Sequence, residues 1–116
     1  MTMTNREIAE AFSGHRFDDA LSHFADAVEW ELIGDETVSG RDRVAEWCAG
    51  ITTELADTTT SFPSFVTIDG GDVVAVDSVS VYADPDGETS TVSSCDIYHF
   101  TDGKVTRVRS YTVAVE

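Results

Sequence analysis

The stretch STVSSCDIYHFTDGKVTRVRSYTVAV, residues 90–115, predicts one long β-hairpin at the end of the chain. Asp102-Gly103 is typical of a two-residue type I′ turn, and it lies between two runs suited to strands. A turn at this pair sets the register, because a two-residue loop leaves no freedom in the pairing. The register places three pairs of side chains opposite one another: Asp96 with Arg109, Tyr98 with Arg107, and Ser94 with Tyr111.

The rest of the chain predicts helices followed by antiparallel strands. In chain order we expect a helix that begins at the capping box Thr4-Asn5-Arg6-Glu7 and ends at Gly14, a second short helix, a strand at Val28–Leu32, a loop at Gly34–Ser39, a helix from about Gly40 to Leu55, and strands at about 60–68, 73–83 and 88–100. This pattern predicts a single α+β domain over residues 1–116, with its helices on one face of the sheet.

The composition limits the classes of partner. The 116 residues include 22 Asp and Glu against 7 Lys and Arg, a net charge of −15. Such a field repels phosphate groups, so nucleic acids and anionic membranes are poor partners. Two explanations fit this charge equally well. The surface is adapted to high salt, or the protein is simply acidic and comes from a lysine-poor genome. The N-terminal residues lack the apolar segment of a signal peptide, so we expect a cytoplasmic protein.

One face of the predicted sheet combines apolar residues with a polar centre. The polar residues expected there are Ser64, Asp77, Ser94, Asp96 and Arg109, and the aromatic residues expected to line the same space are Trp30, Trp47, Phe62, Tyr98 and Tyr111. Polar groups that converge within an apolar concave surface are typical of a small-molecule pocket. The histidines do not have the spacing of metal ligands, so we expect no metal.

Asp96 and Arg109 allow two interpretations. They form either the acid/base centre of a buried site or a cross-strand ion pair with a structural role. In both cases the guanidinium group would lower the pKa of Asp96, which favours an ionised base over a protonated donor.

Three segments resemble the SnoaL-like branch of the nuclear-transport-factor-2-like superfamily. They are FADAVEW at 24–30, GRDRV at 40–44 and DIYHFTDGKV at 96–105. The superfamily includes polyketide cyclases, ketosteroid isomerases, limonene-epoxide hydrolases and non-catalytic binding domains. The resemblance implies a cone-shaped α+β barrel of the cystatin-like type, a curved antiparallel sheet wrapped round helices, with a pocket at its wide end and homodimers through the sheet.

The resemblance also implies roles for individual residues. Asp96 lies at the acid/base position of the cyclases, and Glu31 falls at the base position of the isomerases. Strand alternation, however, places Glu31 outward, so its direction stays open. The isomerases' helical tyrosine falls on Ile8. Asp77, Arg109 and Asp96 offer the residue types of the hydrolases' Asp-Arg-Asp trio, although on different strands.

These observations favour a domain that binds a small apolar organic ligand without a cofactor. If it is an enzyme, Asp96, Arg109 and Glu31 are the candidate catalytic residues for proton transfer on an apolar carbonyl compound, of the isomerase or cyclase type. One alternative is a non-catalytic ligand-binding or dimerisation domain. A second is water activation of the epoxide-hydrolase type by an Asp/Arg/Asp cluster.

Overall fold

The computed structural model describes residues 2–115. Its elements are, in chain order, α1 (Asn5–Ser13), α2 (Phe17–Leu21), β1 (Phe24–Leu32), β2 (Thr37–Ser39), α3 (Arg41–Glu54), β3 (Thr59–Asp69), β4 (Val73–Ala83), β5 (Thr89–Thr101) and β6 (Lys104–Val115). The strands form one sheet in the order β2-β1-β6-β5-β4-β3. Within the described residues only β1 and β6 pair in parallel. The predicted α+β class is therefore confirmed.

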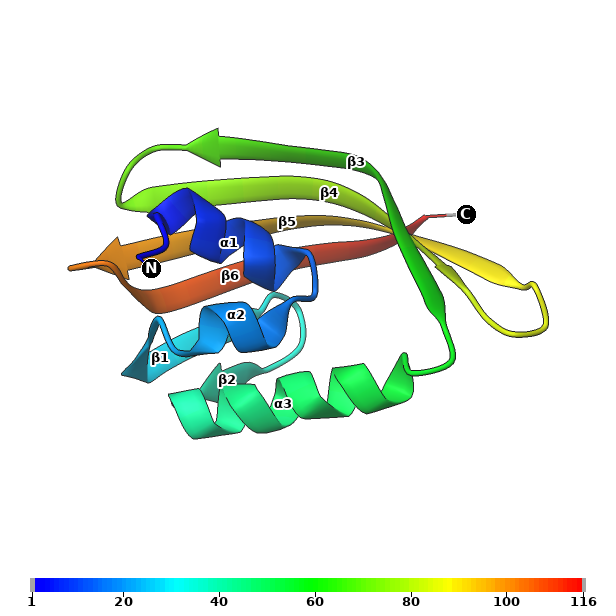
Figure 1. Ribbon diagram of the computed structural model, residues 1–116, viewed down its shortest axis with the longest axis horizontal. Coiled ribbons are helices and arrows are strands. Elements are labelled where there is room, and N and C mark those ends of the chain that lie inside the picture. The colour runs from blue at the N-terminus through cyan, green and yellow to red at the C-terminus, as the bar shows by residue number, and fades with distance from the viewer. Residues whose placement is uncertain (1, 116) are drawn as a thin grey trace.

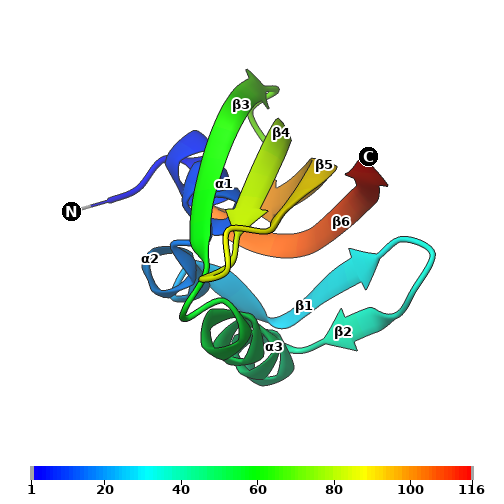
Figure 2. The same ribbon diagram turned by 90° about the vertical axis from the view of Figure 1, so that its right-hand side faces the viewer.

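The sheet is strongly curved, and the three helices lie on its concave side (Figures 1 and 2). The end-on view in Figure 2 shows the strands arranged as an open arc from β3 to β2, with α1 and α2 across the opening and α3 beside β1 and β2. The core fills the space between these helices and the sheet. At its centre the Phe12 ring contacts the rings of Phe17, Phe24, Trp30 and Tyr98.

The predicted helices are present with nearly the expected bounds. Thr4 and Glu7 form the capping box of α1, and their side chains and backbone amides bond reciprocally. In α3, Val44 and Cys48 are buried, whereas Trp47 and Ile51 are only partly buried against the core. The segment expected to be a loop contains the short strand β2, which pairs with β1. No helix among residues 2–115 is long and apolar enough to cross a bilayer.

The C-terminal hairpin has the predicted turn but a different register. Asp102 and Gly103 both have positive φ, as a type I′ turn requires, and Thr101 pairs with Lys104. A β-bulge then follows, because His99 pairs with Arg107 while Phe100 pairs with Val105. From this point the register is shifted by one residue. The predicted pairs are therefore wrong, and Asp96 lies opposite Ser110 instead of Arg109.

Burial explains why the bulge is favoured. Val105 and Val108 are both fully buried, yet they are three positions apart and would point to opposite faces of a regular strand. The extra residue, Thr106, brings both valines to the inner face, and its hydroxyl donates a hydrogen bond to the carbonyl oxygen of His99. Without the bulge, the guanidinium groups of Arg107 and Arg109 would face the core. Burying a charged group there is strongly unfavourable unless it is paired.

β4 also presents the opposite face to the one predicted. Asp77 was expected to face inward, and alternation turns Val73, Ala75, Val79 and Val81 the same way, whereas the buried residues are Val74, Val76, Ser78 and Ser80. Both alternating sets of this strand contain valines, so alternation alone does not decide the direction. The pairing of β4 with β5 decides it, because Val76 lies opposite Asp96 and both face the helices. Two serines consequently line the concave side.

Candidate functional site

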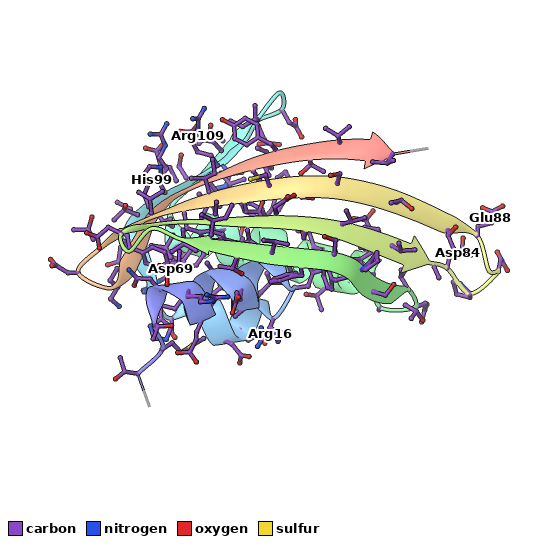
Figure 3. All side chains as sticks on the ribbon, turned by 90° about the horizontal axis from the view of Figure 1, so that it is seen from above. Arg16, Asp69, Asp84, Glu88, His99 and Arg109 are labelled. Carbon is purple, nitrogen blue, oxygen red and sulfur yellow. The ribbon has the colours of Figure 1, made fainter. Side chains whose placement is uncertain are left out.

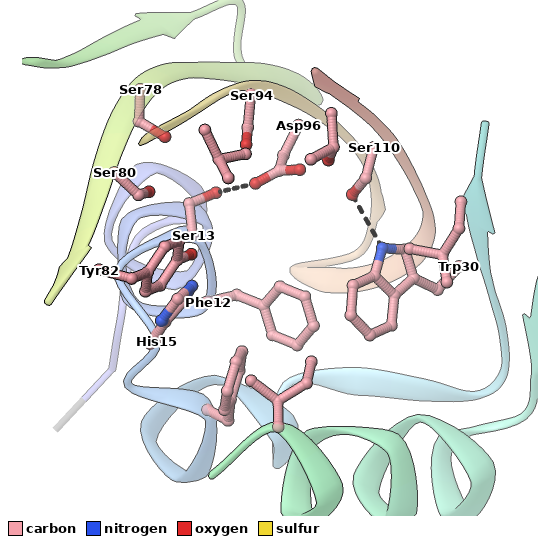
Figure 4. A pocket seen from close by; sticks show the side chains of 15 residues that line it. Phe12, Ser13, His15, Trp30, Ser78, Ser80, Tyr82, Ser94, Asp96 and Ser110 are labelled. Atoms are coloured by element: carbon pink, nitrogen blue, oxygen red, sulfur yellow. Dashed lines mark hydrogen bonds between the residues drawn. The ribbon is translucent and has the colours of Figure 1, made fainter. Parts of the chain in front are cut away.

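A cavity of about 140 Å3 lies between the concave face of β4, β5 and β6 and the helices. Hydroxyl groups line its sheet side, and Figure 4 shows those of Ser78, Ser80, Ser94 and Ser110 around Asp96. Aromatic rings line its other walls, namely Phe12, Phe17, Trp30 and Tyr82. One half of the cavity can therefore form hydrogen bonds, while the other offers flat apolar surfaces.

Asp96 is the carboxyl group of the cavity, and α1 holds it in place. The Ser13 hydroxyl, at the end of α1, donates a hydrogen bond of 2.7 Å to Oδ2 of Asp96. The same hydroxyl lies 2.6 Å from the Tyr98 hydroxyl. A serine hydroxyl has only one proton to donate, so when Ser13 donates to Asp96, Tyr98 donates to Ser13. The result is a hydrogen-bonded chain from Tyr98 through Ser13 to Asp96.

Tyr98 supports the site from the core and lies behind the cavity surface. Its side chain is fully buried, and burial, the largest effect, raises its pKa well above the ordinary value. The hydroxyl therefore stays protonated and available as a donor to Ser13. Tyr98 therefore contacts Asp96 through Ser13 and does not line the cavity, where the sequence had predicted a contact with a ligand.

The electrostatic setting of Asp96 differs from the one expected. Burial raises the pKa of this carboxyl group, and hydrogen bonding by Ser110 and Ser13 and the charge of His15 only partly offset that effect. The lowering expected from Arg109 is absent, because Arg109 lies on the convex face of the sheet (Figure 3). A carboxyl group with a raised pKa is closer to the range in which it can both accept and return a proton at neutral pH.

Arg109 and Glu31 belong to an ion cluster on the convex face. The guanidinium Nε atoms of Arg107 and Arg109 donate to the two carboxylate oxygens of Glu31 at 2.8 and 3.0 Å. These contacts, led by the hydrogen bond from Arg107, lower the pKa of Glu31. Strand alternation therefore predicted the direction of Glu31 correctly, and its inward placement from the isomerase alignment is wrong. Neither Glu31 nor Arg109 shares the cavity with Asp96.

The other predicted lining residues are divided among several places. Trp30 and Ser94 line the cavity, and the indole Nε1 of Trp30 donates to the Ser110 hydroxyl at 2.8 Å. Trp47 and Phe62 line separate depressions on the helical side. Ser64, Asp77 and Tyr111 are exposed on the convex face, where the Arg109 guanidinium lies 5.5 Å from the Tyr111 ring centre. An Asp77/Arg109/Asp96 trio is therefore wrong.

Several residues of the cavity were not predicted. Ser13 and His15 come from the end of α1, where the sequence offers only the helix terminator Gly14 as a signal. Because Asp77 and Arg109 were expected to face inward, strand alternation placed Ser78, Ser80 and Ser110 on the outer face. The sequence does show small hydroxyl residues at alternating positions. Which face of the sheet these residues occupy, however, depends on the bulge.

A curved sheet with a cavity on its concave side defines the nuclear-transport-factor-2-like class of small α+β proteins. The profile of the SnoaL-like domain matches residues 5–108, and the chain belongs to that family. No curated protein matches the chain.

Solved structures with the same fold cover nearly the whole chain. A nuclear-transport-factor-2-like protein of unknown function from Cytophaga hutchinsonii is 27% identical, with a TM-score of 0.79 over 91% of this chain and 93% of that one. A candidate polyketide cyclase from Xanthomonas campestris is 22% identical, with a TM-score of 0.71 over 90% and 83%. TerC, co-crystallised with polyporic acid, is 23% identical, with a TM-score of 0.65 over 91% and 85%. The last two establish the shared fold alone.

The raised pKa of Asp96 predicts how stability depends on pH. The folded protein holds this proton more tightly than the unfolded chain, so the contribution to stability is complete below the ordinary pKa of 3.8 and is lost as pH rises through the folded pKa. Asp96→Asn removes this dependence. Relative to wild type, its free energy of unfolding should rise across that window by about 1.4 kcal/mol for each unit separating the two pKa values. Urea denaturation at a series of pH values measures this.

Asp77→Asn is the matched control, because it removes one negative charge from an exposed position on the neighbouring strand. Asp77→Asn therefore measures how much the free energy of unfolding changes when one negative charge is removed from the surface. If Asp96→Asn and Asp77→Asn showed the same pH dependence, the burial of the Asp96 carboxyl group would have no energetic effect, and our description of the site would be wrong.

Proposed function

We propose that this SnoaL-like domain binds a compact carbonyl compound in the cavity and transfers a proton at the carbon next to the carbonyl group. The observation that carries this proposal is Asp96, a carboxyl group held by a hydrogen-bonded chain, with its pKa raised by burial, inside a cavity with aromatic walls. In the proposed step the Asp96 carboxylate removes the proton and later returns it to carbon.

The cavity's size restricts the ligand. An apolar cavity of about 150 Å3 takes one benzene ring, and drug-sized ligands occupy roughly 300–1,000 Å3. A cavity of about 140 Å3 therefore suits a molecule with a single ring. The aromatic walls favour a flat or cyclic apolar body, and the serine hydroxyls favour oxygen substituents. The co-crystallisation of TerC with polyporic acid supports an organic ligand as the occupant.

Non-catalytic binding is the second candidate, because the same cavity can hold a ligand without reaction. Hydrogen–deuterium exchange at the carbons beside the carbonyl group of cyclohexanone, followed by proton NMR in deuterated buffer, separates the two. We expect wild type to accelerate the exchange and Asp96→Asn to reduce that acceleration by about 10²–10⁴-fold, the usual contribution of a general base.

Asp77→Asn, which leaves the cavity intact, should exchange cyclohexanone at the wild-type rate. Undiminished exchange in Asp96→Asn would rule out Asp96 as the base. Binding without any acceleration by wild type, for cyclohexanone and other ring ketones alike, would favour the non-catalytic function.

We also propose a homodimer through the convex face of the sheet. This face exposes large apolar side chains, among them Val66 at 52%, Ile68 at 61% and Val113 at 62%. Exposed apolar patches on a sheet mark interaction surfaces. The face also carries both signs of charge, with Asp77 on β4 and the Arg107 and Arg109 pair on β6, so a two-fold axis can bring unlike charges together.

Val113→Asp should convert the dimer to a monomer, because it buries an unpaired charge in the interface. Ala49→Asp adds the same charge on the exposed surface of α3 and should remain dimeric. Sedimentation velocity in buffered high salt, which screens the repulsion between two chains of charge −15, measures both masses. A monomeric wild type, or a Val113→Asp variant that is still dimeric, would contradict this interface.

A further inference from the structure

His15 occupies a backbone position where glycine is usual. After α1 the amides of His15 and Arg16 donate to the carbonyl oxygens of Phe12 and Ala11 at 3.1 and 2.8 Å. This pattern is a Schellman motif, in which the residue in the place of His15 takes a left-handed conformation. His15 has φ of 65°, whereas the adjacent Gly14 has φ of −84°. A side chain kept at such a position points to a function for that side chain.

The imidazole ring is fixed by its aromatic neighbours. It stacks on Phe17 at 5.4 Å and on Tyr82 at 6.1 Å between ring centres, and it meets Phe62 edge-on at 5.6 Å. In this position it lines the same cavity as Asp96 (Figure 4). His15 comes from the helical side and Asp96 from β5, so a ligand between them can contact both.

The surroundings of the ring favour its neutral form. Burial, the larger effect, lowers the pKa of His15, and the negative charge of Asp96 opposes it. The ionisable groups that face the ring are Tyr82 on β4 and Asp96 on β5. On its outer side His15 also lines a depression with Arg16, Asp18 and Asp19, and α3 brings Ile51 and Thr52 close to it. A neutral imidazole can donate one N–H hydrogen bond.

We propose that His15 donates a hydrogen bond to the carbonyl oxygen of the ligand while Asp96 exchanges a proton with the carbon beside it. This inference rests on the proposed function for the role of Asp96, and it adds His15, a residue that was not predicted from the sequence. The ligand class becomes a compact single-ring compound whose carbonyl oxygen points toward the end of α1.

The step balances with these two groups. The Asp96 carboxylate takes the proton, and the electron pair of the C–H bond forms a carbon–carbon double bond. The π pair of the carbonyl group moves onto oxygen, which becomes an enolate. The N–H of His15 stabilises that negative charge, as a donor aimed at a developing oxyanion does. Return of the proton from Asp96 to carbon restores the carbonyl group and the carboxylate.

A pair of probes of nearly equal shape tests the contact without relying on activity. Cyclohexanone carries a carbonyl oxygen where methylcyclohexane carries a methyl group. NMR titration measures the affinity of the protein for each compound. We expect His15→Gly, which suits the left-handed backbone, to weaken cyclohexanone binding by about 3–10-fold, the range for one hydrogen bond, and to leave methylcyclohexane unchanged. His15→Asn, which also tolerates this conformation, guards against a folding defect in the glycine variant.

His99→Asn is the matched control, since His99 lies on the convex face (Figure 3), and it should bind both probes as wild type does. Added imidazole should restore part of the cyclohexanone affinity of His15→Gly, which a purely structural role would not allow. Equal loss of both probes in the two His15 variants, unchanged cyclohexanone affinity, or a wild type that binds neither probe would overturn the proposal.

These experiments distinguish a failure of the His15 inference from a failure of the proposed function. If wild type does not accelerate exchange but His15→Gly still loses affinity for cyclohexanone alone, proton transfer fails and the His15 contact stands. If exchange depends on Asp96 but is indifferent to His15, and the affinities are unchanged, only the His15 inference fails.

Discussion

The β-bulge at Thr106 determines which side chains of β6 face the helices, and the site depends on that choice. The bulge brings both Val105 and Val108 into the core. It therefore also turns Ser110 toward Asp96 and turns Arg107 and Arg109 outward to Glu31. A regular hairpin would have placed a guanidinium group beside the carboxyl group and lowered its pKa. The observed register leaves Asp96 with hydroxyl partners, and burial then raises its pKa.

One side chain at the end of α1 connects a core tyrosine to the carboxyl group of the cavity. Ser13 joins the fully buried Tyr98 to Asp96 through two short hydrogen bonds. The next turn of the chain places His15 on the other side of the cavity. The Schellman motif that ends α1 therefore positions two groups of the site, because Ser13 is its last helical residue and His15 is the residue in the left-handed conformation. Rigid placement of both groups is what proton transfer requires.

Local sequence signals predicted the fold, and long-range pairing decided the site. The capping box at Thr4, the Asp102-Gly103 turn and the helix expected from about Gly40 to Leu55 each depend on neighbouring residues, and each is present. The partner of Asp96 depended on the bulge at Thr106, on the neighbouring strand, and one extra residue reverses every side chain beyond it. The odd spacing of Val105 and Val108 was the available signal. His15 left no such signal, since a histidine after a helix-ending glycine is an ordinary surface residue in most sequences.

The central claim is that Asp96 is a partly buried carboxyl group held by hydroxyl partners, poised to exchange a proton. Its own titration tests this most directly. Carboxyl carbon-13 NMR on protein labelled at aspartate, with the Asp96 signal assigned by its loss in Asp96→Asn, gives the pKa of this group. We predict a value above the ordinary 3.8. A value at or below 3.8 would mean that a solvated or positively charged setting holds the ionised form, and it would contradict the account of the site.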